Sequence, residues 1–536
     1  MTAWKKRPMT SPFYLLLTAG LAGTLLIEAL LAPRPCPFWQ RGGAAASVHL
    51  GSWLLTFGAF FAVLQRPGLA VVTLLALQLV VVQSSNTKSQ TLNEPFICHD
   101  FEYFWDAIRH PRLYVPFFGV RLAIAASTAG VVAIAAFFYW EASAVSQWGG
   151  WAFLATCGGL CVSGAVLIAL GLRRLDAITL HPAHDLETLG LFASLWAYGV
   201  ALLRSSAPPP DASPFYHDTV APPAAPTTVL PHTVLVQSES FSDPRSWCPD
   251  VADDLLPHWD LSGRQAQQRG TLSVPAWGAN TVRTECAVLT GLTPEQWGIR
   301  QFNPYRTLAR RHFPSLAATF KKAGYRTVCV HPYPASFYFR HRVMPQLGFD
   351  TFIDVEDFSP DDRNGQYIGD AAVARKVAAL LDDSADAPLF IFVITMENHG
   401  PLDLERPRHD ALADTLPRAP WPLPAHQRNL AVYLHHLRQA DAMLETLTRA
   451  LGQGSRPGVL GWYGDHVPIL PQAYAYYSAP TGETPYMLWS SQKNQRDRHP
   501  TTPQRLAANE LGSVLLQHVW QAASGRQGPR KDSEYQ

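Results

Sequence analysis

The 536-residue sequence lacks the features of a disulfide-stabilised or nucleic-acid-binding protein. Seven cysteines are too few for a disulfide scaffold in a chain of this length, and none falls in a CxxC zinc pattern. Lys and Arg number 43 against 42 Asp and Glu, so the net charge is close to zero at +1. No stripe of basic residues is present, and the composition therefore excludes nucleic acid as an expected partner.

Charged residues are also scarce up to about residue 204, where apolar runs dominate. Five segments approach the ~20 apolar residues that a helix needs to cross a bilayer. They are residues 12–32, 44–64, 68–82, 115–139 and 151–172. The first is too long for a cleavable signal peptide, and further spans follow it. We expect a sixth apolar stretch, residues 186–203, to lie on the membrane surface, with a sixth span as the alternative.

Basic residues before the first span predict the orientation. Lys5, Lys6 and Arg7 place the N-terminus in the cytoplasm by the positive-inside rule. Five crossings then put the C-terminal half outside the cytoplasm, whereas six would return it. Cys36 and Cys98 fall in two loops on the same outer side, so a disulfide between them is left open.

A proline-rich linker separates this half from a sequence of ordinary polarity. From His232 onward short apolar strands alternate with helical patterns, which predicts an α/β domain with a largely parallel central sheet. The expected domains are a membrane domain over residues 1–175, an interfacial helix and linker over 176–231, the α/β domain over 232–523, and a disordered tail over 524–536.

Four apolar runs in the second half stop at a potential ligand or catalytic group. These groups are Glu239 after residues 233–238, His331 after 326–330, Glu397-Asn398-His399 after 389–395, and Asp465-His466 after 458–464. Open α/β sheets place their sites outside the carboxyl ends of their strands, so we expect the groups to meet there. Glu239, Asp465 and His466 would form a site for one divalent metal, namely Mn²⁺, Mg²⁺ or Zn²⁺.

A candidate nucleophile precedes an expected helix. Gly278-Ala-Asn280 is loop-like and residues 282–289 have a helical pattern, so Thr281 lies at a helix N-terminus. Free N–H groups and the helix dipole favour a phosphate there. Metal coordination would activate the Thr281 hydroxyl, while a role as a simple N-cap is the alternative.

Together these elements resemble the lipoteichoic acid synthase branch of the alkaline phosphatase/sulfatase superfamily. The motifs that carry the resemblance are Ser238-Glu239-Ser240, Gly278-Ala-Asn-Thr281-Val-Arg-Thr-Glu285, Glu397-Asn-His399-Gly-Pro and Tyr463-Gly-Asp465-His466. It covers residues 230–520 closely and the membrane half in architecture. The resemblance implies a polytopic helical membrane domain followed by a sulfatase-like, alkaline phosphatase-type domain outside the cytoplasm.

The same resemblance implies residue roles. The metal ligands would be Glu239, Thr281, Asp465 and His466, with Thr281 also the phosphorylated nucleophile, and the phosphoglycerol would be held by His331, Arg340 and His399. The best-known members have a Trp two residues before this Arg, whereas this chain has Tyr338. Arg283 and Glu285 are expected to be structural, with Glu285 orienting Arg283 or a loop.

The implied function is transfer of phosphoglycerol from a phosphatidylglycerol-like lipid to an envelope glycan through phosphothreonine. The expected location is a bacterial inner membrane with the catalytic domain in the periplasm, and Mn²⁺ is the first expectation for the metal. Phosphoethanolamine transfer and hydrolysis are the alternatives, although residues 275–283 lack the C/S-x-P-x-R motif of sulfatases. A non-catalytic scaffold of the same fold would be expected to have lost these residues.

Overall fold

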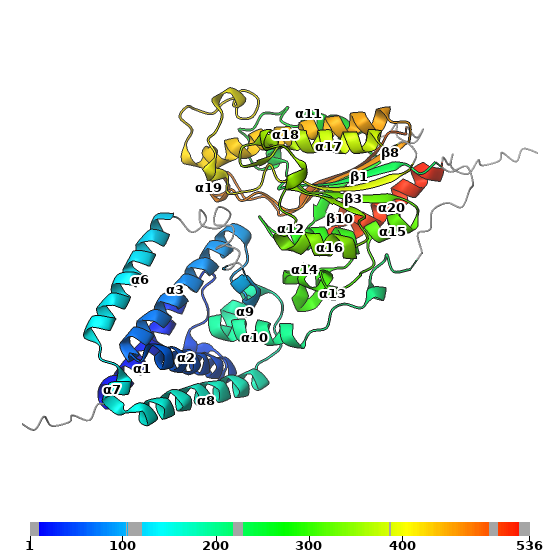
Figure 1. The fold of residues 1–536 in the computed structure, drawn as a ribbon. Helices are drawn as coiled ribbons and strands as arrows, with labels where there is room; N and C mark the ends of the chain where they lie inside the picture. Colours follow the sequence, from blue (N-terminus) through cyan, green and yellow to red (C-terminus); the bar gives the residue numbers. More distant parts are fainter. Residues whose placement is uncertain are drawn as a thin grey trace, which may run out of the picture. The chain divides into compact units, whose positions relative to one another are not determined.

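The computed structural model describes residues 10–102, 104, 120–217, 229–384, 387–492 and 502–524. Two compact units make up the chain, Met1–Ser205 and Ser206–Gln536 (Figure 1). The described part of the first unit is helical, and the second contains the β-sheets. Lys5, Lys6 and Arg7, residues 218–228 of the linker and nearly all of the predicted disordered tail lie outside the described residues.

The first unit contains several long apolar helices. They are α1 (Thr10–Glu28), α2 (Gly43–Leu64), α3 (Pro67–Leu92), α6 (Val120–Trp140) and α8 (Gly150–Arg174), with the short α7 (Ala144–Trp148) before α8. Among the described residues, four segments are long and apolar enough to cross a membrane: Gly43–Leu64, Pro67–Leu92, Thr128–Trp148 and Gly150–Arg174. Pro12–Glu28 and Leu191–Arg204 are apolar but shorter.

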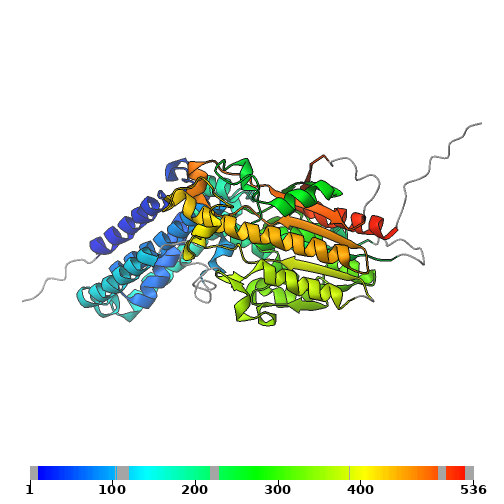
Figure 2. The same ribbon diagram turned by 90° about the horizontal axis from the view of Figure 1, so that it is seen from above.

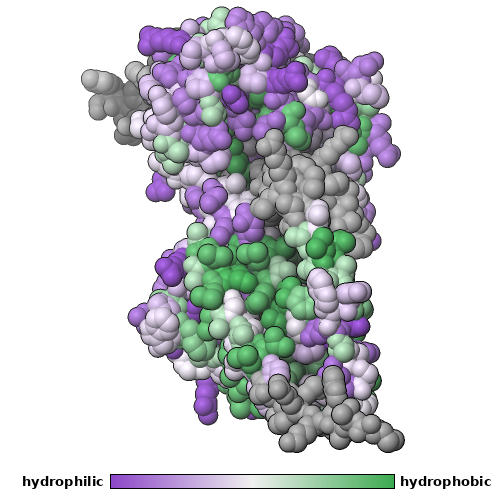
Figure 3. All heavy atoms as spheres, turned by 90° about the vertical axis from the view of Figure 1, so that its left-hand side faces the viewer, coloured by the Kyte–Doolittle hydropathy of each residue, from purple (hydrophilic) through white to green (hydrophobic). Residues whose placement is uncertain are grey.

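Apolar side chains also cover the outside of this unit. Val131, Tyr139 and Trp151 are 68%, 84% and 89% exposed. Figure 3 shows hydrophobic residues gathered over the surface of the first unit. Because soluble proteins rarely expose so much contiguous apolar surface, this unit is suited to a lipid environment.

The third helix is longer than the sequence pattern predicts. The expected span ended at residue 82, but α3 continues to Leu92 through a polar segment. Lys88 is buried there and its ammonium lies 2.5 Å from Glu94 and 2.7 Å from Asp100. These ion pairs let polar residues continue the helix inside the unit, which hydropathy alone does not reveal.

Two short helices, α9 (Pro182–Leu189) and α10 (Leu191–Arg204), follow α8, and α10 is hydrogen-bonded to the end of α1 and to the middle of α2. The Leu191 N–H donates to Glu28 Oε1 at 2.6 Å, at the C-terminal end of α1. Trp196 Nε1 donates to Ser52 Oγ on α2 at 3.0 Å.

Cys36 and Cys98 are both free thiols, so the disulfide left open by the sequence is absent.

A largely parallel sheet forms the centre of the second unit, as predicted. Its eight strands run in the order β10-β2-β9-β8-β1-β7-β3-β4. They are β1 (His232–Ser238), β2 (Gln268–Ser273), β3 (Arg326–Val330), β4 (Thr351–Ile353), β7 (Leu389–Ile394), β8 (Gly458–Gly464), β9 (Thr484–Ser490) and β10 (Gln504–Ala507), with β5 (Arg363–Asn364) and β6 (Tyr367–Ile368) forming a separate pair. Within the eight-stranded sheet, β9 runs antiparallel to both of its neighbours.

Helices cover both faces of this sheet (Figure 1), and Figure 2 looks down on one of the two helical layers. One face packs against α11 (Pro257–Gln265), α17 (Asp370–Asp382), α18 (Ala425–Gln453) and α19 (Pro471–Tyr476). The other packs against α12 (Thr281–Thr290), α13 (Pro294–Trp297), α14 (Tyr305–Leu308), α15 (Leu316–Lys322), α16 (Arg340–Gln346) and α20 (Ala508–Ser524).

The central strands supply apolar side chains to both layers. Along β7, Ile391 and Val393 enter the core beside α17 and α18, whereas Phe390 and Phe392 enter the core beside α12 and α15. The ring of Phe320 stacks on Phe390 with centroids 4.2 Å apart. Burial on both faces explains why these strands are continuous apolar runs rather than alternating patterns.

Candidate active site

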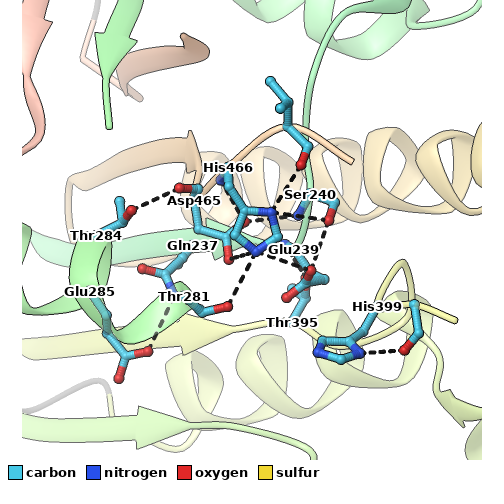
Figure 4. A network of polar contacts seen from close by, with 12 residues as sticks. Gln237, Glu239, Ser240, Thr281, Thr284, Glu285, Thr395, His399, Asp465 and His466 are labelled. Atoms are coloured by element: carbon cyan, nitrogen blue, oxygen red, sulfur yellow. Dashed lines mark hydrogen bonds and ion pairs between the residues drawn. The ribbon is translucent and has the colours of Figure 1, made fainter. Parts of the chain in front are cut away.

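Three predicted ligands meet at the carboxyl ends of β1 and β8. The two strands pair in parallel, with Ser238 opposite Gly464, so the residues that follow each strand lie side by side. Ligand atoms of Glu239, Asp465 and His466 all lie within 4.8 Å of one another (Figure 4). All three side chains are buried.

The chemistry of this cluster fits a cation. His466 Nδ1 lies 3.2 Å from the Val467 carbonyl oxygen, which can only accept, so Nδ1 carries the proton. The unprotonated Nε2 therefore faces Asp465 Oδ2 at 3.2 Å and Glu239 Oε1 at 3.7 Å. Asp465 Oδ2 is buried, and no described residue donates a hydrogen bond to it. Three inward-facing lone pairs would repel one another, and one divalent metal would satisfy them all.

Electrostatics around Glu239 support the same conclusion. Burial, and then the neighbouring charge of Asp465, raise the pKa of Glu239 to about 8. Its Oε1 accepts a hydrogen bond from Ser240 Oγ at 2.8 Å, which opposes the shift. A bound cation would offset the cost of two adjacent buried carboxylates.

Thr281 lies beside this cluster as the first residue of α12. Asn280 before it has a left-handed backbone with φ of 65°. Thr281 Oγ1 lies 3.4 Å from His466 Nε2. One turn on, Thr284 Oγ1 donates to the Asp465 carbonyl at 2.8 Å and ties the helix to the end of β8. The structure thus brings the predicted nucleophile to the predicted ligands.

The predicted substrate-binding residues line the same pocket. Glu239, Thr281, His331, Arg340 and His399 all contribute to its wall. His331 follows β3, and its Nδ1 lies 3.1 Å from the Ile394 carbonyl oxygen. Its Nε2 accepts a hydrogen bond from Arg340 Nη1 at 3.1 Å. Burial and the charge of Arg340 lower the pKa of His331 well below its usual value, so this imidazole is neutral.

His399 follows β7 and is oriented by its own loop. Its Nδ1 lies 2.6 Å from the Gly400 carbonyl oxygen, and the Tyr367 hydroxyl donates to that same oxygen at 3.0 Å. The tautomer with a proton on Nδ1 leaves Nε2 as an acceptor. Burial is the largest effect on the pKa of His399 and lowers it.

Glu285 has a role that the sequence interpretation missed. It was expected to orient Arg283 or a loop, but its carboxylate contacts Arg340 twice, at 2.8 and 3.2 Å. The Tyr305 hydroxyl and the Gln237 amide donate to the same carboxylate. Glu285 is wholly buried. Its position four residues after Thr281, on the same helix face, was the available signal.

Glu397, which belongs to one of the four motifs, is not part of the ligand cluster of Glu239, Asp465 and His466. Its Oε1 accepts from Asn364 Nδ2 at 2.6 Å and lies 3.1 Å from His436 Nδ1. Burial alone would lower the pKa of His436, but hydrogen bonds to Glu397 and Glu405 raise it to about 9. This buried charge network holds the loop that carries His399, and no local pattern pointed to His436.

Protons should compete with the metal at Glu239. Because a carboxyl must be ionised to bind a cation, metal binding at neutral pH is expected to release about one proton. Affinity should fall roughly tenfold for each pH unit below the pKa of about 8. Calorimetric titration of metal-free protein with Mn²⁺, in two buffers of different ionisation enthalpy, measures both effects. In Glu239→Gln, metal binding should weaken and lose this pH dependence. Weaker binding that keeps the wild-type pH dependence would contradict the assignment of the competing proton to Glu239.

Comparisons with known proteins agree with this geometry. The Sulfatase family model matches residues 231–519, more than half of the chain. The capsular polysaccharide biosynthesis protein RkpI of Rhizobium meliloti (strain 1021) is 34% identical over 308 residues, which are 56% of this chain and 52% of that protein. The chain spans about half the length of the curated relatives it matches.

Two solved structures show similarity at lower identity. The integral membrane protein lipooligosaccharide phosphoethanolamine transferase A from Neisseria meningitidis is 14% identical, covers 96% of both chains and has a TM-score of 0.58. The Streptococcus pyogenes phosphoglycerol transferase GacH is 22% identical over 55% of this chain and 75% of its own, with a TM-score of 0.46. The first shares its fold with this chain. The family match confirms the superfamily that the motifs predict: the protein belongs to the sulfatase family.

Proposed function

We propose that the protein is a metal-dependent transferase that moves phosphoglycerol from a phosphatidylglycerol-like lipid to an envelope glycan. The observation that carries the proposal is the position of Thr281. Its hydroxyl lies at a helix N-terminus, beside the ligand cluster and in the pocket of Arg340 and His399. Free N–H groups, a cation site and a guanidinium around one hydroxyl suit attack on a phosphodiester.

The reaction would proceed in two displacements. The Thr281 oxygen forms a bond to phosphorus, the bond from phosphorus to the diacylglycerol oxygen breaks, and diacylglycerol leaves with the proton that the Thr281 hydroxyl gives up. A glycan hydroxyl then displaces the threonine oxygen and takes the phosphoglycerol, and its proton restores the Thr281 hydroxyl. When bound, a divalent metal would supply Lewis-acid stabilisation and activate the hydroxyl.

Residues of the chain would divide the remaining tasks. Arg340 would bind the nonbridging phosphate oxygens, since its guanidinium stays charged. Burial would lower the pKa of Arg340 but Glu285 raises it. Neutral His331, hydrogen-bonded to Arg340, would orient it rather than supply a proton. His399 has its lowered pKa and an acceptor at Nε2, so it would take the proton of the acceptor hydroxyl.

A phosphoethanolamine donor is the second candidate, and the full-length structural neighbour is named for that transfer. An ammonium head group calls for a carboxylate partner or for a cage of several aromatic rings, of which the pocket lining supplies two, Phe337 and Tyr338. Among the described residues that line the pocket, Glu239 is the one carboxylate, and it belongs to the ligand cluster. The uncharged glycerol therefore suits the pocket better.

The glycan acceptor and the location rest on separate observations. The relative named for capsular polysaccharide biosynthesis supports a glycan acceptor. Four membrane-length helices plus the shorter Pro12–Glu28 support five crossings, with Leu191–Arg204 held at the membrane surface. We infer a bacterial inner-membrane location with a periplasmic catalytic domain and Mn²⁺ as the metal, Zn²⁺ and Mg²⁺ being the alternatives.

Thr281→Ala should abolish transfer. Removing a nucleophile typically costs more than about a thousand-fold in rate. Full-length protein with Mn²⁺ and labelled phosphatidylglycerol should yield diacylglycerol and phosphorylated protein, both of which the variant lacks. Thr448→Ala on α18, whose hydroxyl bonds a carbonyl of its own helix, is the control and should behave as wild type. Turnover with labelling by Thr281→Ala would refute the mechanism.

Glu285→Gln should weaken donor binding, because Arg340 loses the charge that positions it. We expect KM for the lipid donor to rise roughly tenfold, since hydrogen bonds to charged groups contribute about 1.5–3 kcal/mol. Tyr305→Phe removes a single donor to Glu285 and should have a smaller effect. Titration with Mn²⁺ should give wild-type affinity in both variants. A parallel loss of metal affinity would indicate general disruption instead.

Topology reporters should separate five spans from six. A reporter fused after Leu172 and another after Arg204 should both report an extracytoplasmic position, whereas one fused after Leu64 should report the cytoplasm. The expectation follows from the alternation of the helices and from the N-terminal charges. A cytoplasmic signal after Arg204 would overturn both the topology and the lipid donor.

A further inference from the structure

One segment that borders the candidate pocket contains basic but no acidic residues, although the basic residues are too scattered to form a stripe along the sequence. Between Glu295 and Asp350 the sequence contains nine Lys and Arg residues and no Asp or Glu, although the whole chain has a net charge of only +1. The nine are Arg300, Arg306, Arg310, Arg311, Lys321, Lys322, Arg326, Arg340 and Arg342. Such an imbalance within one domain indicates an anionic partner.

Some of these charges lie far from the pocket. Lys321 and Lys322 end α15, just before β3 begins at Arg326, whereas the pocket lies at the other end of that strand. Lys321 pairs with Asp350 at 2.6 Å, and Arg326 donates to Ser384 at 2.9 Å. These residues therefore belong to a different surface and serve as an internal comparison.

Three other charges lie on or beside the helix that begins at the pocket residue Arg340 and the helix in contact with it. Arg306, Arg310 and Arg342 are exposed on or next to α14 and α16, two helices that contact each other. Arg306 lies with its guanidinium carbon 6.0 Å from the ring centre of Phe339. Phe339 is itself 38% exposed. We name Arg306, Arg310, Phe339 and Arg342 the lip surface.

An unusual backbone turn separates the exposed lip surface from the buried wall of the pocket. Tyr338 and Phe339 have φ of 52° and 59°, an uncommon left-handed conformation for aromatic residues. The turn leaves Phe339 exposed, while Arg340, the next residue, is buried in the pocket wall. Phe337 and Tyr338 line the pocket just inside the lip. Strain of this kind persists where surrounding contacts enforce it, and here the contact is Glu285 with Arg340.

We propose that the lip surface binds the anionic head-group layer of a bilayer, so that a donor lipid passes from the membrane into the pocket. Exposed arginines with an aromatic ring between them are the composition of surfaces that bind at a membrane interface. An uncharged glycan would offer these arginines no ionic partner. The inference rests on the proposed lipid donor, and the membrane-length helices of the same chain keep this domain near lipid.

Hydrogen exchange on the full-length protein tests the lip directly. The protein is reconstituted in phosphatidylcholine vesicles and in equimolar phosphatidylcholine and phosphatidylserine, an anionic lipid that is not the proposed donor. Peptides covering residues 305–310 and 337–342 should exchange more slowly with the anionic lipid, and high salt should remove the difference. Equal exchange in both vesicles would overturn the proposal. So would protection that requires an added anionic polysaccharide, which would assign the surface to the acceptor.

Matched variants separate the lip from general charge effects. Combined Arg306→Gln, Arg310→Gln and Arg342→Gln should lose the protection, with lipid binding weakened about five-fold for each arginine at low salt. The control combines Arg264→Gln, Lys322→Gln and Arg449→Gln, three exposed positions away from the lip. A loss of protection in the control would contradict the proposal.

A soluble phosphodiester separates failure of this inference from failure of the proposed function. Its turnover needs Thr281 but no bilayer, so the lip variants should cleave it at the wild-type rate. Phe339→Asn, which suits a left-handed backbone, should reduce turnover of vesicle-borne donor and spare the soluble ester. If anionic lipid protects the lip surface but turnover does not require Thr281, the proposed mechanism is refuted and the proposal for the lip surface stands. Equal loss on both substrates would refute the lip instead.

Discussion

Parallel pairing of β1 with β8 places Ser238 opposite Gly464, and the ligand cluster depends on that register. A shift of one residue would turn Glu239 or Asp465 to the other face of the sheet, because side chains alternate along a strand. The pairing is stabilised by burial on both faces, with Val236 and Leu235 entering opposite cores. The favourable free energy of burying the apolar layers therefore offsets the unfavourable burial of two carboxylates and an imidazole next to one another.

A second constraint joins the proposed nucleophile, Thr281, to Arg340 on the other side of the pocket. Glu285, on the helix that begins at Thr281, holds Arg340 and receives a hydrogen bond from Tyr305. Three helices, α12, α14 and α16, thus meet at one buried carboxylate. An unpaired charge there would be strongly unfavourable, so the ion pair holds Arg340 in a single orientation. Catalytic centres benefit from such fixed charges, since no reorganisation is needed when the reaction occurs.

Buried polar pairs also organise the helical unit. Glu28 pairs with Arg41 at 2.8 Å and accepts the N–H of Leu191, and Lys88 lies between Glu94 and Asp100. Ionised groups inside an apolar unit are costly unless paired, and these are paired. Glu28 thereby ties the start of α10 to the end of α1, and Lys88 ties the end of α3 to the segment that follows it. In the second unit, Arg340 is likewise buried and paired, with Glu285, whereas the arginines around Phe339 are exposed to solvent.

The sequence by itself determined the fold class and which three residues would meet in the ligand cluster. Long apolar runs require helices in a lipid-like environment, and strands buried on both faces produce continuous apolar runs whose carboxyl ends carry Glu239, Asp465 and His466. Local patterns did not reveal the end of α3, the contact of Glu285 with Arg340, or the network around His436. In each case a polar residue is placed by a partner far away in the chain, such as Arg340 at 55 residues from Glu285. The hydrophobic periodicity of a segment shows which of its side chains face water and which face apolar surroundings. Which distant charged residues pair is decided only when the sheet and helices pack together.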